Sequence, residues 1–150
     1  MPISFYCKSY KELSLNTLYE IMKLRQLVFV VEQECPYLDA DGKDAEALHI
    51  LCCQDQELLA YARIIPKGIM YPDFCAIGRV VTKPSERNKG LGTELMQFTI
   101  QQAQLKFPQC KIKISAQCYL LDFYRALGFK DIEEEYLEDN IPHKAMILIS

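Results

Sequence analysis

Residues 80–93 of the chain read Val-Val-Thr-Lys-Pro-Ser-Glu-Arg-Asn-Lys-Gly-Leu-Gly-Thr. An apolar run typical of a β-strand is followed by a polar turn and by the start of a helix that carries Gly90 and Gly92. A glycine inside a helix costs about 1 kcal/mol relative to alanine, so two in the first turn need a physical reason. Because glycine has no side chain, backbone N–H groups in this turn can approach a phosphate oxygen directly. The helix dipole would attract such an anion, and so would the positive charges of Arg87 and Lys89.

Two known phosphate-binding patterns do not fit this loop. A P-loop requires a lysine directly after its last glycine, and here Thr93 follows Gly92. A dinucleotide-binding fingerprint requires a third glycine, which is missing, and the polar turn before Gly90 is too long for it. Anion binding and an ordinary strand-to-helix connection without a ligand both remain open at this point.

The composition favours one globular domain that spans residues 1–150, because half of the 150 residues are apolar. The formal net charge of −3 gives no basic excess for nucleic-acid binding, and no segment resembles a membrane span or a signal peptide. We therefore expect a cytoplasmic monomer or homodimer that binds neither nucleic acid nor membranes. Seven scattered cysteines without a CxxC pair, and only two histidines, predict reduced thiols and no metal site.

The pattern of apolar residues outside the loop predicts a mixed α/β sheet. The expected strands are residues 3–9, 49–54, 57–66, 75–82, 111–116, 129–137 and 144–149, and the expected helices are residues 14–31, 90–106 and 119–127. Ser14 is the expected N-cap of the first helix and Gly128 the C-cap of the last. The strand–helix–strand–helix–strand order in the middle predicts a central parallel pair flanked by antiparallel strands.

Two motifs in this order resemble the signatures of the GNAT superfamily of N-acetyltransferases. Arg-x-x-Gly-x-Gly at 87–92, behind Val-Thr-x-Pro at 81–84, resembles the superfamily's acetyl-CoA pyrophosphate loop. Phe-Tyr-Arg-Ala-Leu-Gly-Phe at 123–129 resembles its second signature, a helix with a tyrosine four residues before Gly-Phe. Residues 24–41 and the Asp-Asn-Ile-Pro-His run at 139–143 resemble the ElaA-like branch. The resemblance implies a single-domain, mostly antiparallel sheet whose central parallel strands splay apart to admit the pantetheine arm.

The resemblance also implies a function: transfer of an acetyl group from acetyl-CoA to a primary amine of a small molecule or peptide, with CoA as the product. A non-catalytic acyl-CoA-binding or regulatory module on the same fold is the alternative. The implied cofactor contacts are Val80, Val81, Thr82, Arg87, Asn88, Lys89, Gly90, Leu91, Gly92, Thr93, Gln117 and Tyr124. Gln117 stands where many relatives carry an asparagine, and because it retains the amide we expect the contact to persist.

Tyr124 is the implied general acid for the departing thiolate. A phenol with a pKa near 10 is protonated at neutral pH, and an alkyl thiol has a pKa of roughly 8.5, so Tyr124 can protonate the sulfur or donate a hydrogen bond to it. On helix spacing alone it would instead pack with Leu120, Leu121 and Leu127.

Cys118 is the only candidate nucleophile near the cofactor arm and no histidine adjoins it, so we expect direct transfer in a ternary complex rather than an acyl-enzyme.

The candidate acceptor-binding residues lie on the first expected helix and on two strands. Arg25 and Glu32 fall within the helix's apolar face, with Phe29 between them. Unpaired charges in a core are costly, so these two either form structural ion pairs or face a solvated acceptor pocket. Arg79 is either the ion-pair partner of Glu32 or an acceptor-site group. His143 falls in the last hairpin, which borders the acceptor site in GNAT folds.

The general base is left open between Glu32, His49 and a chain of waters, because the strands that carry a glutamate in many relatives have none here. His49 at the start of a strand could equally be structural. The acidic residues Asp39, Asp41 and Asp44 are expected in a solvated loop, with attraction of a cationic amine as the alternative.

Overall fold

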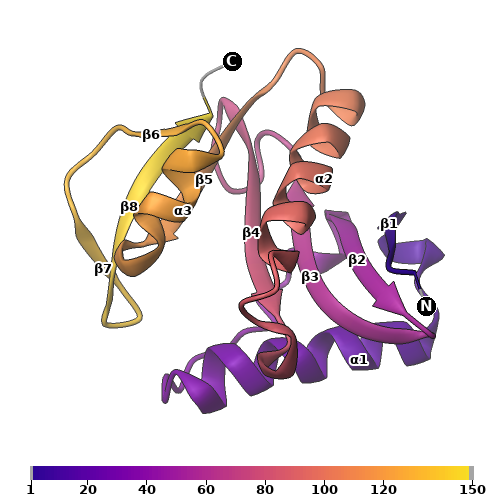
Figure 1. Ribbon diagram of the computed structural model, residues 1–150. Helices are drawn as coiled ribbons and strands as arrows, with labels where there is room; N and C mark the ends of the chain where they lie inside the picture. Colours follow the sequence, from indigo (N-terminus) through magenta and orange to yellow (C-terminus); the bar gives the residue numbers. More distant parts are fainter. Residues whose placement is uncertain (1, 149–150) are drawn as a thin grey trace.

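The computed structural model describes residues 2–148 (Figure 1). All strands form one eight-stranded sheet in the order β1-β2-β3-β4-β5-β8-β6, and β7 also pairs with β8. Among the described residues β4 and β5 are the one parallel pair, as predicted. The elements are β1 (Ser4–Ser9), α1 (Leu15–Arg25), a π-helical segment (Gln26–Glu32), β2 (Leu48–Gln54), β3 (Glu57–Ile65), β4 (Phe74–Thr82), α2 (Leu91–Lys106), β5 (Lys111–Gln117), α3 (Leu121–Ala126), β6 (Phe129–Asp131), β7 (Tyr136–Glu138) and β8 (Ile141–Leu148).

Apart from the buried polar residues His49 and Arg63, strands β2 and β3 are apolar on both faces, and a helix covers each face (Figure 1). Ile50 and Cys52 of β2 pack in the same cluster as Leu95 of α2. Leu51, which lies between them in sequence, packs with Ile21 of α1, since successive strand side chains point to opposite faces. This packing holds α1 and α2 on opposite sides of the sheet.

The first helix begins at its predicted cap, where the Thr17 amide donates to Ser14 Oγ at 3.0 Å. From Gln26 to Glu32 it continues as a π-helix, which has more residues per turn than an α-helix. The apolar face predicted from α-helical spacing is therefore rotated in this segment. As a result Val31, predicted on the apolar face, is 65% exposed. Arg25, which lies on the same predicted face but before the π-helical segment, is fully buried.

Strands β4 and β5 separate after a short parallel pairing of Phe74–Ala76 with Lys111–Lys113. The register between β3 and β4 shifts beyond this point, and Arg79 on β4 has a left-handed backbone with φ 51°. An extra residue of this kind bends a strand and increases its twist. The second half of β4 therefore follows β3 and leaves β5, which produces the predicted splay (Figure 1).

The single strand predicted for residues 129–137 is wrong. The chain forms two short strands, β6 and β7, which pair with opposite ends of β8. Glutamates fill residues 133–135 between them, and glutamate is depleted in strands. β8 begins at Ile141, earlier than the predicted Lys144, and the predicted end at Ile149 lies outside the described residues. No helix within residues 2–148 is long and apolar enough to cross a membrane.

Candidate active site

A cavity of about 1240 Å³ lies where β4 and β5 separate. It exceeds the roughly 300–1,000 Å³ of a typical small-molecule pocket, so it has room for a long ligand and a second molecule. Of the predicted cofactor-contacting residues, Lys89 lies outside the wall. Those that line the cavity are Val80, Val81, Thr82, Arg87, Asn88, Gly90, Leu91, Gly92, Thr93, Gln117 and Tyr124.

The first turn of α2 lines this cavity and has no side-chain cap. Gly90 occupies the N-cap position with φ 77°, a left-handed conformation that glycine adopts without strain. The amides of a helix's first turn lack intrahelical partners and lie at the positive end of the dipole. The predicted strand–turn–helix connection is thus present, with the geometry of an anion-binding helix N-terminus.

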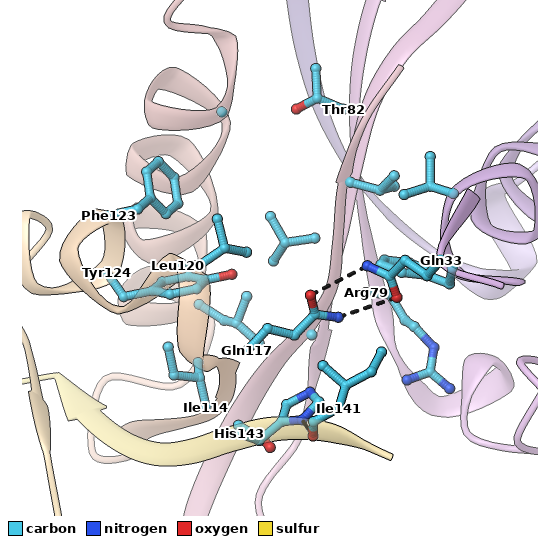
Figure 2. A pocket seen from close by; sticks show the side chains of 18 of the residues that line it. Gln33, Arg79, Thr82, Ile114, Gln117, Leu120, Phe123, Tyr124, Ile141 and His143 are labelled. Atoms are coloured by element: carbon cyan, nitrogen blue, oxygen red, sulfur yellow. Dashed lines mark hydrogen bonds between the residues drawn. The ribbon is translucent and has the colours of Figure 1, made fainter. Parts of the chain in front are cut away.

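Tyr124 of α3 forms another part of the wall. Its ring packs edge-on against Phe123 and Phe129, with centroids 5.1 and 5.9 Å away. Figure 2 shows the hydroxyl directed into the space between α3 and β4. Burial raises the pKa of the Tyr124 phenol above its ordinary value, so the hydroxyl keeps its proton at neutral pH. The ring therefore packs as helix spacing suggested, while the hydroxyl faces the cavity.

A pair of amides bridges the two sides of the cavity (Figure 2). Gln33 Nε2 donates to Gln117 Oε1 at 3.3 Å, and Gln117 Nε2 donates to Gln33 Oε1 at 3.4 Å. Both distances are longer than the usual 2.7–3.2 Å, so this bridge is weak and can open for a ligand. Gln33 carried no sequence signal, because its role depends on a partner that lies 84 residues away along the chain.

Arg25 belongs to a buried ion-pair network and does not line the cavity. Its Nε donates to Asp39 and its Nη1 to Asp44, both at 2.7 Å. Asp39 and Asp44 are buried as well, so the solvated loop predicted for them is wrong. The physical reason is that a buried guanidinium requires carboxylate partners, which the following loop folds back to supply.

Arg63 and Arg79 belong to the same network, which we call the arginine–aspartate network. Arg63, which sequence analysis did not single out, donates to Asp41 at 2.9 and 2.5 Å. Arg79 approaches Asp39 at 2.8 Å and Asp41 at 3.4 Å, so of the two alternatives predicted for it the pairing with Glu32 is wrong. Both arginines also line the cavity, so one end of the network forms part of the wall.

Glu32 pairs instead with Arg87 of the loop before α2. Arg87 Nη1 and Nη2 donate to its two carboxylate oxygens at 2.8 and 2.5 Å. These hydrogen bonds lower the pKa of the exposed Glu32 carboxyl, which makes it a weak base. Phe29, from the same π-helical segment, lines the cavity beside Glu32.

The two histidines have different surroundings. His49 is fully buried outside the cavity wall: its Nε2 donates to the Asp44 carbonyl at 2.9 Å, and its Nδ1 accepts from the Tyr61 hydroxyl at 2.6 Å. Burial also lowers the pKa of His49, so of the two roles left open for it, general base and structural residue, its surroundings favour the structural one. His143 is 5% exposed and lines the cavity.

The remaining chemical groups limit what the cavity can hold. Within residues 2–148 no cluster of three or more histidine, cysteine, aspartate or glutamate side chains could hold a metal ion. All seven cysteines are free thiols, as predicted. Besides its charged side chains and the Cys35 thiol, the cavity offers backbone amides, a protonated phenol and an imidazole as polar groups.

Comparison with known proteins agrees with this geometry. The acetyltransferase (GNAT) domain family matches residues 18–150. A UPF0039 protein of Synechocystis is 37% identical over 98% of this chain and 96% of its own, and Escherichia coli ElaA is 40% identical over 91% and 90%. The crystal structure of an acyl-CoA N-acyltransferase from Pseudomonas aeruginosa superposes with a TM-score of 0.92, 37% identity and 99% and 100% coverage. The splayed sheet, the two signature motifs and these relatives together show that the chain belongs to the GNAT superfamily of N-acetyltransferases, in its ElaA-like branch.

Proposed function

We propose that the protein transfers the acetyl group of acetyl-CoA directly to a primary amine of a small molecule or peptide, within a ternary complex. One observation carries this proposal: a single cavity joins the uncapped first turn of α2 to the splay between β4 and β5 and to the β7–β8 hairpin. The first turn of α2 suits the anionic head of the cofactor, and the splay between β4 and β5 suits its extended arm. The β7–β8 hairpin suits a second substrate. The same residues would hold a larger acyl-CoA, so the donor has to be tested directly.

The donor is held by backbone groups and one arginine. The pyrophosphate binds the first-turn amides of α2, and Arg87 exchanges Glu32 for a phosphate, since its guanidinium already lies on the cavity wall. The arm passes between β4 and β5. Beyond Ala76, the edge of β4 that faces β5 has no strand partner among the described residues. Backbone N–H groups of Val80 and Thr82, on the edge of β4 that faces away from β3, then polarise the thioester carbonyl, because strand geometry fixes them before reaction.

Tyr124 assists departure of the thiolate. Burial raises the pKa of its phenol well above the roughly 8.5 of an alkyl thiol, so complete proton transfer to sulfur is uphill. A hydrogen bond from the hydroxyl to the developing thiolate has no such penalty and strengthens as negative charge builds on sulfur. We therefore assign Tyr124 to hydrogen-bond stabilisation of the leaving group, with the thiolate protonated as it is released.

The thiols near the site support direct transfer. Cys118 lies outside the cavity wall, and burial and a hydrogen bond to Glu135 raise the pKa of its thiol. Cys35 does line the cavity, but its Sγ donates to the Asp139 carbonyl at 3.3 Å, and no imidazole or other base contacts it among the described residues. A nucleophilic cysteine needs a thiolate, so neither residue is prepared to form an acyl-enzyme.

The proposal is tested by binding and turnover measured together. In a thermal-shift series, acetyl-CoA and CoA should raise the melting temperature, whereas ATP and NAD should not. A free-thiol assay with acetyl-CoA should then show turnover with at least one of propylamine, 1,4-diaminobutane, tyramine, glycine and a short peptide. Binding of CoA without acetyl transfer to any amine would favour the non-catalytic acyl-CoA-binding module. No binding of either ligand would exclude both functions.

Gly92 provides a sharper test of the cofactor loop. A Cβ at this position would lie 3.7 Å from the Phe123 ring and 3.9 Å from Thr82 Oγ1, ordinary contact distances that require no shift of the fold. Gly92→Val should therefore remain folded but weaken CoA binding at least about tenfold, or 1.4 kcal/mol, because its methyl groups fill cavity space in front of the amides. Gly90 is less suitable, since its φ of 77° would strain any replacement.

The measurement is calorimetric titration of CoA, with thermal unfolding to show that the variant is folded. Gln101→Val is the matched control: it places the same branched residue on an exposed position of α2 outside the cavity wall. Unchanged CoA affinity of a folded Gly92→Val variant would remove this turn from the binding site.

A further inference from the structure

His143 is the one imidazole that reaches the cavity. It lies on β8 opposite Gln117 of β5, and it is 5% exposed. Its ring stacks on the Tyr136 ring of β7, with centroids 6.1 Å apart and an interplanar angle of 27°. Both strands therefore fix the ring orientation, and Figure 2 shows the side chain beside Ile141 at the edge of the cavity.

The backbone determines which nitrogen of His143 carries the proton. Nδ1 lies 2.7 Å from the Ile141 carbonyl oxygen. A carbonyl oxygen can only accept a hydrogen bond, so Nδ1 must be the donor. In the neutral ring Nε2 then holds an unshared electron pair, and no protein group of residues 2–148 donates a hydrogen bond to it. A buried imidazole in this state is ready to accept a proton from a ligand.

The charged group nearest to Nε2 is a carboxylate. Glu138 Oε2 of β7 lies 3.7 Å from Nε2, and Ser115 of β5 donates to the other carboxylate oxygen at 3.1 Å. Among the other groups packed around the ring, Tyr136 is neutral and Gln117 is uncharged, while Lys144 on β8 pairs with Asp131 at 3.5 Å. A protonated amine placed between Glu138 and Nε2 would thus meet one negative charge and one proton acceptor.

We propose that His143 Nε2 is the general base that deprotonates the acceptor ammonium and that Glu138 binds this ammonium before the transfer. The inference rests on the proposed acetyltransferase function. Nε2 takes one proton from R–NH₃⁺, and the free amine attacks the thioester carbonyl, forming the C–N bond. The C–S bond breaks with its electron pair going to sulfur. The second amine proton ends on the thiolate, and the imidazolium returns its proton to solvent.

The alternative bases are less suitable on the same criteria. Glu32 is held by two hydrogen bonds from Arg87, which lower the pKa of its carboxyl. His49 has both ring nitrogens occupied and lies outside the cavity wall. Among residues 2–148 only His143 combines a place in the wall with a free basic nitrogen.

The kinetic test uses His143→Asn, because an asparagine amide can keep the donation to Ile141 while removing Nε2. With the amine that gives the fastest wild-type rate in the panel above, kcat/KM should fall about 10²-fold. The acidic limb of the pH–rate profile should also disappear, while CoA affinity stays within about twofold. The control is His49→Gln, which should keep the wild-type profile. An unchanged rate and pH profile in folded His143→Asn would overturn the assignment.

A second measurement needs no acceptor. The chain has only two histidines, so nitrogen-15 NMR of the wild type and His49→Gln assigns both rings. The neutral ring of His143 should be the tautomer with its proton on Nδ1, whereas the tautomer with its proton on Nε2 would contradict the proposal. If no panel amine is acetylated by the wild type, the proposed function fails, and this spectrum still decides whether His143 can act as a base.

Discussion

An Arg25→Met variant is expected to lose about 3–5 kcal/mol of its free energy of unfolding. Methionine keeps most of the apolar stem but removes the guanidinium that pairs with Asp39 and Asp44 at 2.7 Å. Both carboxylates are buried, so the variant would leave negative charges in the core with too few partners. Removing one member of a buried ion pair costs more than the pair contributes, because the partner stays desolvated.

Urea unfolding of both proteins at neutral pH measures this difference. The control is Lys23→Met on the same helix, where the lysine makes a surface pair with Glu20 at 3.5 Å and its side chain is 68% exposed. Such surface pairs contribute roughly 0–1 kcal/mol, so the control should unfold close to the wild type. A loss below about 1 kcal/mol for Arg25→Met would show that the arginine–aspartate network is solvated in solution.

The same network gives the stability a defined pH dependence. Burial alone would raise the pKa of the Asp41 and Asp44 carboxyls, but hydrogen bonds and charge outweigh it and lower both pKa values. For Asp41 they come chiefly from Arg63, and for Asp44 from Arg25 and Arg63. A carboxyl with a folded-state pKa below its unfolded value of about 3.9 stabilises the fold above that value. This contribution should be lost as the pH falls through 4 toward the folded pKa, and the acid loss should be smaller in Arg25→Met.

Much of the fold is predictable because local signals agree with the tertiary structure. Ser14 caps the first helix, Gly90 stands before α2 in a left-handed conformation, and Gly128 ends α3 with φ 105°. The conformation at each of these positions depends only on residues within about one helical turn of it.

The π-helical segment is different, because α-helical spacing places Val31 on the apolar face and the observed winding exposes it. A change from α-helical to π-helical winding cannot be recognised from the amino-acid composition of the segment.

In the candidate site, too, residues within contiguous motifs could be predicted, whereas residues that depend on distant partners could not. The α2 loop and Tyr124 stand in contiguous motifs and could be located before the fold was known. Gln33 and Arg63 could not, because their partners lie 84 and 22 residues away and only the folded chain brings them together. Arg25 can be recognised from the sequence as a charge that needs a partner, but the sequence does not distinguish an aspartate loop from a substrate as that partner.

Tyr124→Phe is expected to lower the acetyl-transfer rate by about 10²- to 10³-fold while leaving CoA affinity nearly unchanged. The substitution keeps the ring that packs against Phe123 and Phe129, so the fold and the cavity wall should persist. It removes only the hydroxyl, for which no hydrogen-bond partner is found among residues 2–148 and which is therefore free to serve the leaving sulfur. Tyr19→Phe, an exposed position on α1, is the control and should turn over normally.

The leaving group distinguishes a chemical role of this hydroxyl from a structural one. If the hydroxyl stabilises negative charge on sulfur, an acetyl thioester of a thiol with a much lower pKa than CoA needs less of that help. The rate ratio between wild type and Tyr124→Phe should therefore shrink with such a donor, measured with the same amine under single-turnover conditions. A merely misplaced cavity wall would slow both donors by the same factor. Normal turnover of acetyl-CoA by the variant would make Tyr124 a packing residue, and the thiolate would then have to leave with assistance from another group.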